Sequence, residues 1–297
     1  MSGEQSEAEV KQQVSAFYNE IGWKMENDGF YQNARYEDLR PVSREYIHKC
    51  HLRVNRYLHP TGKYLLDAGS GPVQWPEYLT YSQNYQYRVC LDISIVALEE
   101  ARHRLGDKGL YVVSDVANLP FKSDAFDGLV SLHTLHHIPP AEQPDAYAGF
   151  VRVLKPERTG VVVNAWTSPV LMTRMGWLIA LMDRVNGVLN RFKPNKEIKL
   201  PEEKVKPAAS KPTGTFTQHI TPEWLKENLA GRVDFKIMVW RSASVRFLRT
   251  VIQPWLFGKL WLRWLYNQEE QEPEYYGENG QYPLIVISKP KSAANRE

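Results

Sequence analysis

Three aspartates in the first half of the chain each stand just after a short apolar run: Asp67, Asp92 and Asp115. Carboxylates can accept hydrogen bonds from hydroxyl and amino groups of a ligand, or lie against a positive charge. Short apolar runs bounded by turn residues are typical of strands buried in a parallel sheet. Ligands of open α/β sheets bind at the carboxyl ends of such strands, so we expect the carboxylates to share one sheet edge. Taken singly, each aspartate is equally typical of a helix N-cap or a turn.

A glycine turn begins two residues after Asp67 and has the sequence Gly69-Ser70-Gly71. Glycine tolerates unusual backbone angles and has no Cβ, so the main chain can approach a ligand closely there. An NAD or FAD site would have a third glycine where Gln74 stands, and an ATP or GTP loop would close with Lys followed by Ser or Thr. Neither pattern is present. The charge of Asp67 favours a ligand with a cationic end over one that presents a pyrophosphate. By itself, the turn is also compatible with an ordinary loop at a sheet edge.

The turn resembles the first motif of class I S-adenosylmethionine-dependent methyltransferases, an acid followed by alternating glycines, with Val73 in place of the third glycine. Later segments follow the same family order: Asp92 after the second strand, Asp115 after the third, and then Leu119–Phe121. The resemblance covers residues 8–165 and the C-terminal strand. It implies an α/β fold with a seven-stranded, mostly parallel, doubly wound Rossmann-like sheet. It also implies S-adenosyl-L-methionine as cofactor and S-adenosyl-L-homocysteine as product.

The candidate cofactor site follows from these motifs. Asp92 stands 25 residues after Asp67, near the offset of about 20 at which an acid accepts ribose hydroxyls in nucleotide-binding folds. The resemblance implies that Asp115 accepts the adenine amino group and that Tyr18, on the first helix, closes over the cofactor. The residues expected to bind the cofactor are Tyr18, Asp67, Gly69, Ser70, Gly71, Asp92, Ile93, Asp115, Val116, Leu132 and His133.

Histidines are the candidate bases for the reaction. Methyl transfer is an in-line displacement, so the protein mainly supplies alignment, water exclusion and, where the acceptor carries a proton, a base. His133, His136 and His137 follow the fourth strand, and His219 precedes a helix that starts at Pro222. Imidazole can act as a base near neutral pH, although capping or core hydrogen bonding is its commoner role. We take His133 as the residue nearest the acceptor and His219 as a second candidate. No carboxylate or cysteine accompanies the trio, so no metal is expected.

Composition narrows the class of protein. The chain has 297 residues, 43% of them hydrophobic, which is enough for a full α/β core with added elements. A formal charge of +3 without basic clusters in the core half makes nucleic acid an improbable partner. Cys50 and Cys90 have no zinc-type pairing and are expected to be small buried residues of a reducing compartment. The polar, acidic segment Met1–Glu9 does not resemble a signal peptide. We therefore expect a cytoplasmic enzyme.

Chain length and motif positions divide the sequence into three parts. Two insertions follow the fifth and sixth strands, and parallel strands deliver them to the same edge as the glycine turn, where they are expected to form a lid or substrate platform. The expected ranges are 1–61 for N-terminal helices that cover the cofactor, 62–165, 222–240 and 283–290 for the methyltransferase core, and 166–221 and 241–282 for the insertions.

The two insertions differ in composition. The first has an apolar helix over residues 170–189, which Arg174, Asp183 and Arg184 make a poor membrane span, and then a segment from Lys193 to Pro212 expected to be mobile. The second is basic and rich in tryptophan over residues 240–266. Such a helix can lie at a membrane interface, which would place the enzyme peripherally at the membrane. Packing of the same stripe on the core or on a second subunit is the alternative, so a homo-oligomer remains open.

The sequence therefore predicts a methyltransferase that acts on a small or amphipathic acceptor. The aromatic residues of the insertions favour a lipid, a quinone or a lipid-linked glycan. One alternative is a protein or tRNA methyltransferase, although the Asn-Pro-Pro-Tyr type of loop is missing after the fourth strand. Another is a catalytically silent cofactor-binding scaffold whose tryptophan-rich arm binds a partner protein. Turnover of the cofactor distinguishes these classes.

Overall fold

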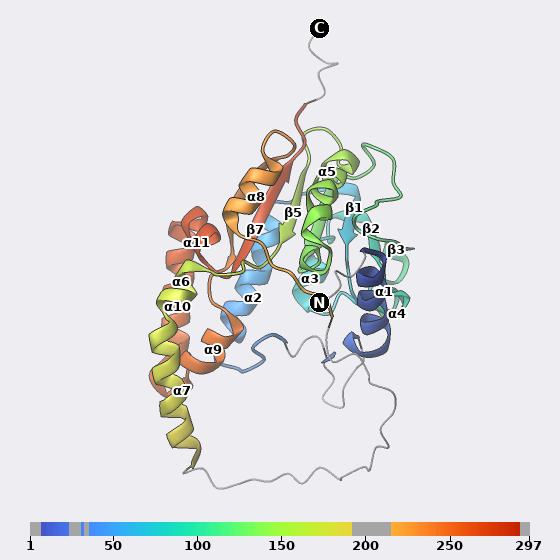
Figure 1. Cartoon of the computed structure of the whole chain (residues 1–297). Coiled ribbons are helices and arrows are strands. Elements are labelled where there is room, and N and C mark those ends of the chain that lie inside the picture. The colour runs from blue at the N-terminus through green and yellow to red at the C-terminus, as the bar shows by residue number, and fades with distance from the viewer. Residues whose placement is uncertain (1–6, 24–30, 33–35, 192–214, 292–297) are drawn as a thin grey trace, which may run out of the picture.

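The fold is built on one seven-stranded sheet with helices on both faces (Figure 1). The computed structural model describes residues 7–23, 31–32, 36–191 and 215–291. The strand order is β3-β2-β1-β4-β5-β7-β6, and only β7 runs antiparallel to its neighbours, β5 and β6. The predicted doubly wound fold is confirmed. The strands are β1 (Gly62–Ala68), β2 (Tyr85–Asp92), β3 (Gly109–Val113), β4 (Gly128–Leu132), β5 (Thr159–Val163), β6 (Asp234–Arg241) and β7 (Tyr282–Ser288).

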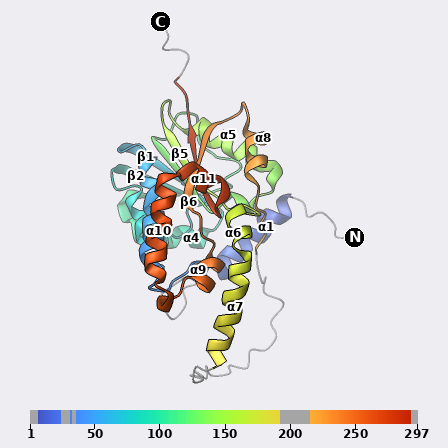
Figure 2. The ribbon, with the colours of Figure 1, turned by 90° about the vertical axis from the view of Figure 1, so that its left-hand side faces the viewer.

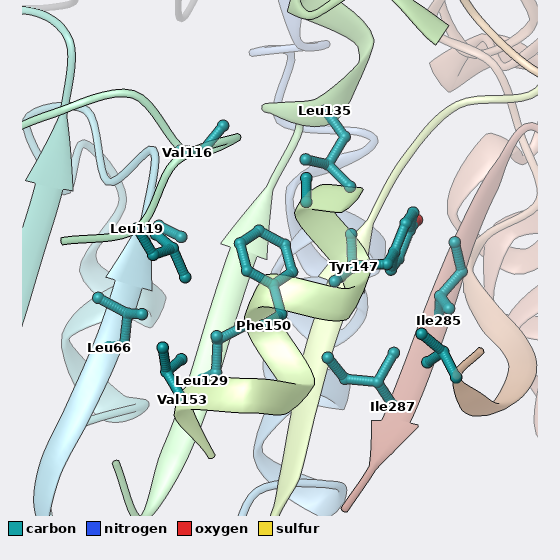
Figure 3. Close-up of a cluster of buried hydrophobic side chains, with 14 of the residues drawn as sticks. Leu66, Val116, Leu119, Leu129, Leu135, Tyr147, Phe150, Val153, Ile285 and Ile287 are labelled. Atoms are coloured by element: carbon teal, nitrogen blue, oxygen red, sulfur yellow. The ribbon is translucent and has the colours of Figure 1, made fainter. Parts of the chain in front are cut away.

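Apolar runs form the central strands because both sheet faces are covered. Leu66 and Leu129 pack under helix α5 (Gln143–Val153), whose Phe150 lies against both strands (Figure 3). Helix α8 (Pro222–Leu229) covers the neighbouring part of this face. On the other face, Leu65 belongs to a second cluster, together with residues of η3 (Arg53–Arg56), α3 (Pro76–Thr80) and α4 (Ile95–Leu105). Burial on both faces favours continuous apolar runs over alternation.

Local sequence signals begin the helices that flank the site. The Ser94 hydroxyl accepts a hydrogen bond from the Ala97 amide and caps α4. The Thr221 hydroxyl does the same for α8, where Pro222 occupies the first turn. Both caps fix the direction in which the chain leaves the sheet edge. The remaining short helices are η4 (Gly106–Lys108), η5 (Leu135–His137) and η6 (Pro140–Glu142).

The N-terminal segment lies over the carboxyl edge of the sheet. Helix α1 (Glu7–Phe17) continues into the π-helical turn η1 (Tyr18–Gly22). Val10, Val14 and Phe17 are buried against a small cluster that includes Ile93 and Phe216. Helix α2 (Arg44–Leu52) then leads back to β1. The free cysteines, Cys50 on α2 and Cys90 on β2, are both buried, as predicted.

The insertions form a helical layer at one side of the sheet (Figure 2). The apolar helix predicted over residues 170–189 is broken at Met175 into α6 (Val170–Arg174) and α7 (Gly176–Arg191). The segment predicted to be mobile, Lys193–Pro212, lies outside the described residues. The second insertion contains α9 (Val245–Val251), η7 (Pro254–Leu256), α10 (Gly258–Gln271) and α11 (Pro273–Asn279). Within the described ranges, no helix combines the length and apolar content needed to cross a bilayer.

A buried polar network attaches the second insertion to the core. Glu269 of α10 is fully buried, and its carboxylate accepts hydrogen bonds from the Tyr46 hydroxyl at 2.6 Å and from the Ser242 amide at 2.9 Å. Arg53 pairs with it at 2.9 Å and also donates to the Trp240 carbonyl. A buried carboxylate is costly unless it is paired in this way. The network therefore fixes how α10 is rotated about its own axis.

Candidate functional site

A cavity of about 470 Å³ opens at the carboxyl edge of the sheet. This volume lies within the range of about 300–1,000 Å³ that small-molecule sites occupy. The cavity is bordered by the ends of β1, β2, β4 and β6, by the start of β7 and by the segment after β3. The residues singled out from the sequence that border it are Tyr18, Asp67, Gly69, Ser70, Gly71, Asp92, Ile93, Asp115, Val116, Leu132, His133 and His219. The structure brings all of them together.

The glycine turn has the backbone that its sequence predicts. Gly69 and Gly71 have positive φ angles of 74° and 53°. A Cβ on Gly69 would lie 2.2 Å from Thr134 Cγ2, so no other residue fits without displacement. Gly69 therefore packs closely against Thr134, and the turn as a whole borders the cavity. Val73, at the third motif position, also has a positive φ of 52° although its branched side chain is fully buried. The position keeps the conformation of glycine at a cost in strain.

Asp67 differs from its expected role of facing a cationic ligand. Its Oδ2 atom accepts hydrogen bonds from Nε of Arg88 at 2.9 Å and from Nη2 at 2.5 Å, and both side chains are buried. Burial raises the pKa of Asp67, and the positive charge of Arg88 offsets this shift only in part. Because Arg88 neutralises the carboxylate from within the core, its main electrostatic partner belongs to the protein. Asp67 nevertheless borders the cavity.

Asp92 is held at the tip of β2 by the two turns that border the cavity. Its Oδ2 atom accepts a hydrogen bond from the Gly71 amide at 2.8 Å, and its Oδ1 atom accepts one from the Ser94 amide at 2.9 Å. Burial raises the pKa of Asp92 to about 6, although both amides favour the ionised form. Each carboxylate oxygen keeps a further lone pair with which it can accept a hydroxyl. This geometry suits the two neighbouring hydroxyls of a ribose.

The raised pKa of Asp92 predicts a pH dependence of cofactor affinity. The ionised carboxylate accepts hydroxyl hydrogen bonds and the protonated one accepts fewer, so affinity should be full above pH 7 and fall as the pH drops through about 6. At pH 5 we expect S-adenosylhomocysteine to bind about tenfold more weakly than at pH 7.5. Calorimetric titration at several pH values measures this, with Asp92→Asn as the variant that loses the dependence. A wild-type affinity that stays flat from pH 5 to 7.5 would contradict the assignment.

Asp115 takes part in an ion pair that the sequence did not reveal. Lys11 of α1 lies 2.8 Å from Asp115 and 2.5 Å from Glu142. Desolvation lowers the pKa of Lys11, but the hydrogen bonds to both carboxylates outweigh it and raise the net value. The Ala117 amide donates to Oδ1 of Asp115 at 2.9 Å. The carboxylate expected near adenine is thus also the anchor of the helix that covers the cavity.

Tyr18 is fixed by His137, one of the three histidines after β4. The Tyr18 hydroxyl and Nε2 of His137 lie 2.8 Å apart, and Nδ1 of His137 lies 2.8 Å from the Phe216 carbonyl. The carbonyl can only accept, so Nδ1 carries the proton and Nε2 accepts from Tyr18. Desolvation lowers the pKa of His137 to about 4, which keeps this neutral form at pH 7. Its role is structural: it joins α1 and η1 to the segment before α8.

His133 has the features expected of a residue that contacts a ligand. Neither of its ring nitrogens has a hydrogen-bond partner in the described part of the chain. Its φ of 57° is unusual for a residue other than glycine, and such strain is found mostly at functional sites. The ring lies 4.8 Å from Trp240 and 5.5 Å from Tyr282, measured between centroids. Desolvation lowers its pKa to about 3. The ring is therefore neutral at pH 7.

Two further histidines line the cavity, one of them buried and the other exposed. His136 is buried, and its ring lies 5.1 Å from that of His219. Desolvation lowers the pKa of both groups. His219 borders the cavity from the segment before α8, on the side of His136. Among the described residues, no cluster of histidine, cysteine and carboxylate side chains is arranged to hold a metal ion.

An aromatic end of the cavity was missed in the sequence. Trp75, Tyr78, Trp240 and Tyr282 line it, together with Arg241. Trp240 and Arg241 close β6 at the same edge as the three aspartates, so the rule used for those aspartates could have found them. Trp75 and Tyr78 follow the glycine turn in sequence. Tyr282 begins β7. Because β7 runs antiparallel to β5, its amino end lies at the edge where the parallel strands have their carboxyl ends.

Arg241 carries a buried charge at this end. Its Nη1 atom donates to Glu37 at 2.5 Å, and the guanidinium lies 4.6 Å from the Tyr282 ring centroid. The Nε atom is buried and has no partner among the described residues. Desolvation lowers the pKa of Arg241, but the charge of Glu37 and its other neighbours raises the net value, so the group stays charged. A guanidinium with unused donors can hold an oxygen atom of a ligand.

Comparisons with known proteins agree with this geometry. Residues 66–162 match the family described as Methyltransferase domain. No curated protein matches the sequence. Among solved structures, the [4+2]-cyclase SpnF is 17% identical with a TM-score of 0.52, covering 97% of this chain and 98% of its own. Geranyl diphosphate C-methyltransferase from Streptomyces coelicolor A3(2) is 14% identical with a TM-score of 0.53, covering 94% and 97%.

A third structure, Haemonchus contortus phosphoethanolamine N-methyltransferase 1, has a TM-score of 0.56 at 10% identity. The match covers the whole of this chain and 52% of that one. At such identities the structures show a shared fold, whereas the family match falls on the glycine turn and the strands that follow it. The cavity is bordered by the glycine turn and by the carboxylates of Asp92 and Asp115. Residues 66–162 therefore form a methyltransferase domain of the class I, Rossmann-like type, and the cofactor of the enzyme is S-adenosyl-L-methionine.

Proposed function

We propose that this enzyme transfers a methyl group to a small or amphipathic acceptor that binds at the aromatic end of the cavity. A lipid, a quinone or a lipid-linked glycan would fit. The observation that carries the proposal is the grouping of Trp75, Tyr78, Trp240 and Tyr282 beside His133 and Arg241. Aromatic side chains offer large apolar surfaces, and a few polar groups among them fix the orientation of a ligand.

The charges at this end favour an acceptor oxygen without a large negative charge. Arg241 is already paired with Glu37, and burial keeps His133 neutral. A phosphate would thus meet one guanidinium that a carboxylate already neutralises. Two of the three neighbours named above are a geranyl diphosphate methyltransferase and a phosphoethanolamine methyltransferase, and both are named for phosphorylated acceptors. The present cavity is better suited to a hydroxyl or carbonyl oxygen, such as that of a quinol or a sugar.

The chemistry assigned to the chain is the alignment of the cofactor and the acceptor. When bound, S-adenosylmethionine supplies an activated methyl group and leaves as S-adenosylhomocysteine. Asp92 would hold the ribose and Asp115 the adenine amino group, while the main chain of the glycine turn would lie beside the cofactor. A free ring nitrogen of His133 would accept a hydrogen bond from the acceptor hydroxyl and orient it for in-line attack. With a pKa of about 3, His133 is a weak base, so orientation is its main contribution. His219 is the second candidate for the histidine that contacts the acceptor.

The N-terminal helices and the two insertions are proposed to act as lid and platform. The contacts that support this role join elements from both sides of the cavity. Lys11 ties α1 to Asp115, Tyr18 ties η1 to His137, and Glu37 ties the segment before α2 to Arg241. Closure of such a lid excludes water from the reacting groups.

The role of His133 predicts a loss of turnover without a loss of cofactor binding. We expect His133→Asn to lower kcat by about 10–100-fold, the effect of one or two hydrogen bonds. Asparagine tolerates the left-handed backbone at this position, so the change tests the ring and leaves the main chain unstrained. Single-turnover assays give the rate, and calorimetry with S-adenosylhomocysteine gives the affinity. His219→Asn is the comparison variant. Wild-type turnover in His133→Asn would remove the assignment.

The proposed function is tested by an acceptor panel. Purified enzyme and S-adenosylmethionine are incubated with demethylated quinols, with detergent-dispersed glycolipids, with free amino acids, with a basic protein and with transfer RNA. We expect S-adenosylhomocysteine release with one of the first two classes. Release with protein or transfer RNA would support the alternative substrate classes. Cofactor binding without release for any acceptor would instead favour a catalytically silent scaffold.

A further inference from the structure

Helix α10 exposes a large apolar face. Phe257, just before the helix, and Leu260, Trp261 and Trp264 are between 54% and 72% exposed. Their spacing of three, four and seven residues places them on one side of the helix. Single exposed apolar residues are ordinary on protein surfaces, but a continuous face of this kind indicates an interaction site.

The exposed face is a fixed property of the fold. Leu262 and Glu269 are buried on the other side of α10, and Glu269 is held by Tyr46, Ser242 and Arg53. Rotating the helix to bury the tryptophans would leave the carboxylate or its partners unpaired, which is costly inside a protein. Of the stripe predicted to pack on the core, on a second subunit or on a membrane, Trp240 is buried in the core, whereas Trp261 and Trp264 are exposed.

Helix α7 adds a second exposed apolar surface to the same helical layer. Trp177, Leu181, Val188 and Leu189 are all exposed on it. The helix packs against α9, where Nδ2 of Asn186 donates to the Thr250 carbonyl at 3.0 Å. Figure 2 shows α7 and α10 extending in the same direction from the sheet, with α9 between them. Helices α7 and α10 are far apart in the sequence but extend from the sheet in the same direction.

The charges of this layer select its partner. From Val245 to Tyr266 the chain contains Arg246, Arg249, Lys259 and Arg263 but no aspartate or glutamate. Arg263 reaches Glu45 of α2 at 3.0 Å, and Arg246 approaches Asp183 of α7 at 3.4 Å, so part of this charge is neutralised. Tryptophan beside arginine and lysine on a helix is the composition of segments that lie in a bilayer interface. Both ion pairs are solvent-exposed and therefore weak, so the basic segment keeps a positive potential that favours anionic headgroups.

We propose that α10 and α7 dock the enzyme on an anionic lipid bilayer, with their apolar faces at the level of the headgroups. Only a few residues of the chain separate the cavity from this helical layer. Trp240 and Arg241 line the cavity, and α9 begins at Val245. Docking would bring the aromatic end of the cavity towards the membrane. The proposal concerns the surface alone and holds whatever acceptor the enzyme uses.

Vesicle sedimentation of the full chain tests the proposal. Wild type is expected to sediment with vesicles of equal parts phosphatidylglycerol and phosphatidylcholine, and much less with phosphatidylcholine alone. The double variant Trp261→Glu and Trp264→Glu should bind the anionic vesicles at least about tenfold more weakly. Binding of the wild type should weaken as salt is raised, because salt screens the attraction between exposed charges. Absence of sedimentation with either vesicle would overturn the proposal.

Two controls separate docking from other effects. Leu110→Glu also introduces a glutamate at an exposed apolar residue, which is 42% exposed on β3 at the far edge of the sheet, and should leave vesicle binding unchanged. Calorimetry with S-adenosylhomocysteine should give wild-type affinity for the double variant, which shows that it is folded. Light scattering measures the oligomeric state. A wild-type dimer that the double variant abolishes, without vesicle binding, would assign the face to a second copy of this chain and exclude the lipid.

Discussion

Replacing Asp67 by asparagine is expected to destabilise the fold by about 3–5 kcal/mol, the cost of breaking a buried ion pair. Asp67 and Arg88 are both buried, and two guanidinium nitrogens donate to the same carboxylate oxygen. The asparagine is nearly isosteric but carries no charge, so Arg88 would keep a positive charge without a counterion. The hydrogen bond that Nη1 of Arg88 donates to the Tyr78 carbonyl is too weak to replace the lost counterion. Urea denaturation followed by far-ultraviolet circular dichroism measures the free energy of unfolding.

A double variant separates the charge from the packing at this site. Asp67→Leu with Arg88→Met removes both charges together, and such exchanges are often neutral or stabilising. We expect the double variant to be clearly more stable than Asp67→Asn. If Asp67→Asn unfolds at the wild-type urea concentration, the ion pair contributes little and the carboxylate is available to a ligand after all. Binding of S-adenosylhomocysteine by the double variant then shows whether the cofactor needs this charge.

Removing the carboxylate of Asp92 is expected to weaken cofactor binding more than any other single change at the cavity. Hydrogen bonds to a charged group contribute about 1.5–3 kcal/mol, and 1.4 kcal/mol is a factor of ten in affinity. We therefore expect Asp92→Ala to bind S-adenosylhomocysteine about 10–100-fold more weakly in calorimetric titration. Part of the loss would come from the glycine turn, because the Gly71 amide loses its acceptor. Asp92→Asn keeps the shape of the side chain and should show a smaller loss.

Asp127 provides a matched control for Asp92. Its carboxylate also accepts two backbone amides, those of Lys63 and Tyr64 at 2.9 and 3.1 Å, but it stands before β4, at the opposite edge of the sheet. Asp127→Asn should lower stability and leave cofactor affinity unchanged. Equal weakening by both substitutions would mean that the effect of Asp92→Asn comes from general destabilisation, and the ribose assignment would then fail.

Short-range patterns in the sequence were enough for much of the fold and part of the cavity. Apolar runs predicted the strands, and the two glycines predicted unusual backbone angles, which the backbone has. The carboxyl ends of parallel strands share one edge, so residues just after predicted strands could be expected together without any knowledge of side-chain contacts. These signals are local, since each depends on a few consecutive residues.

Partners that are distant in the sequence could not be predicted in this way. The sequence contains Lys11 and Asp115, Tyr18 and His137, or Asp67 and Arg88, but nothing in the spacing of these residues pairs them. The same holds for the aromatic end of the cavity, where Tyr282 joins Trp240 only because β7 runs antiparallel beside β6. Asp67 was expected to face the ligand because its charge could be read from the sequence, while the neutralising arginine could not.

The sequence by itself thus indicated the fold class and the edge of the sheet that carries the cavity, because strand periodicity and turn residues act over short distances, and its resemblance to a known family indicated the cofactor. Tertiary structure alone decided which charges are neutralised and which apolar residues remain outside. Trp261 and Trp264 look no different from Trp240 in the sequence, yet the first two are exposed and the third is buried. The difference arises because Glu269 must be buried with Tyr46 and Arg53, and satisfying that carboxylate sets the rotation of the helix that carries both exposed tryptophans.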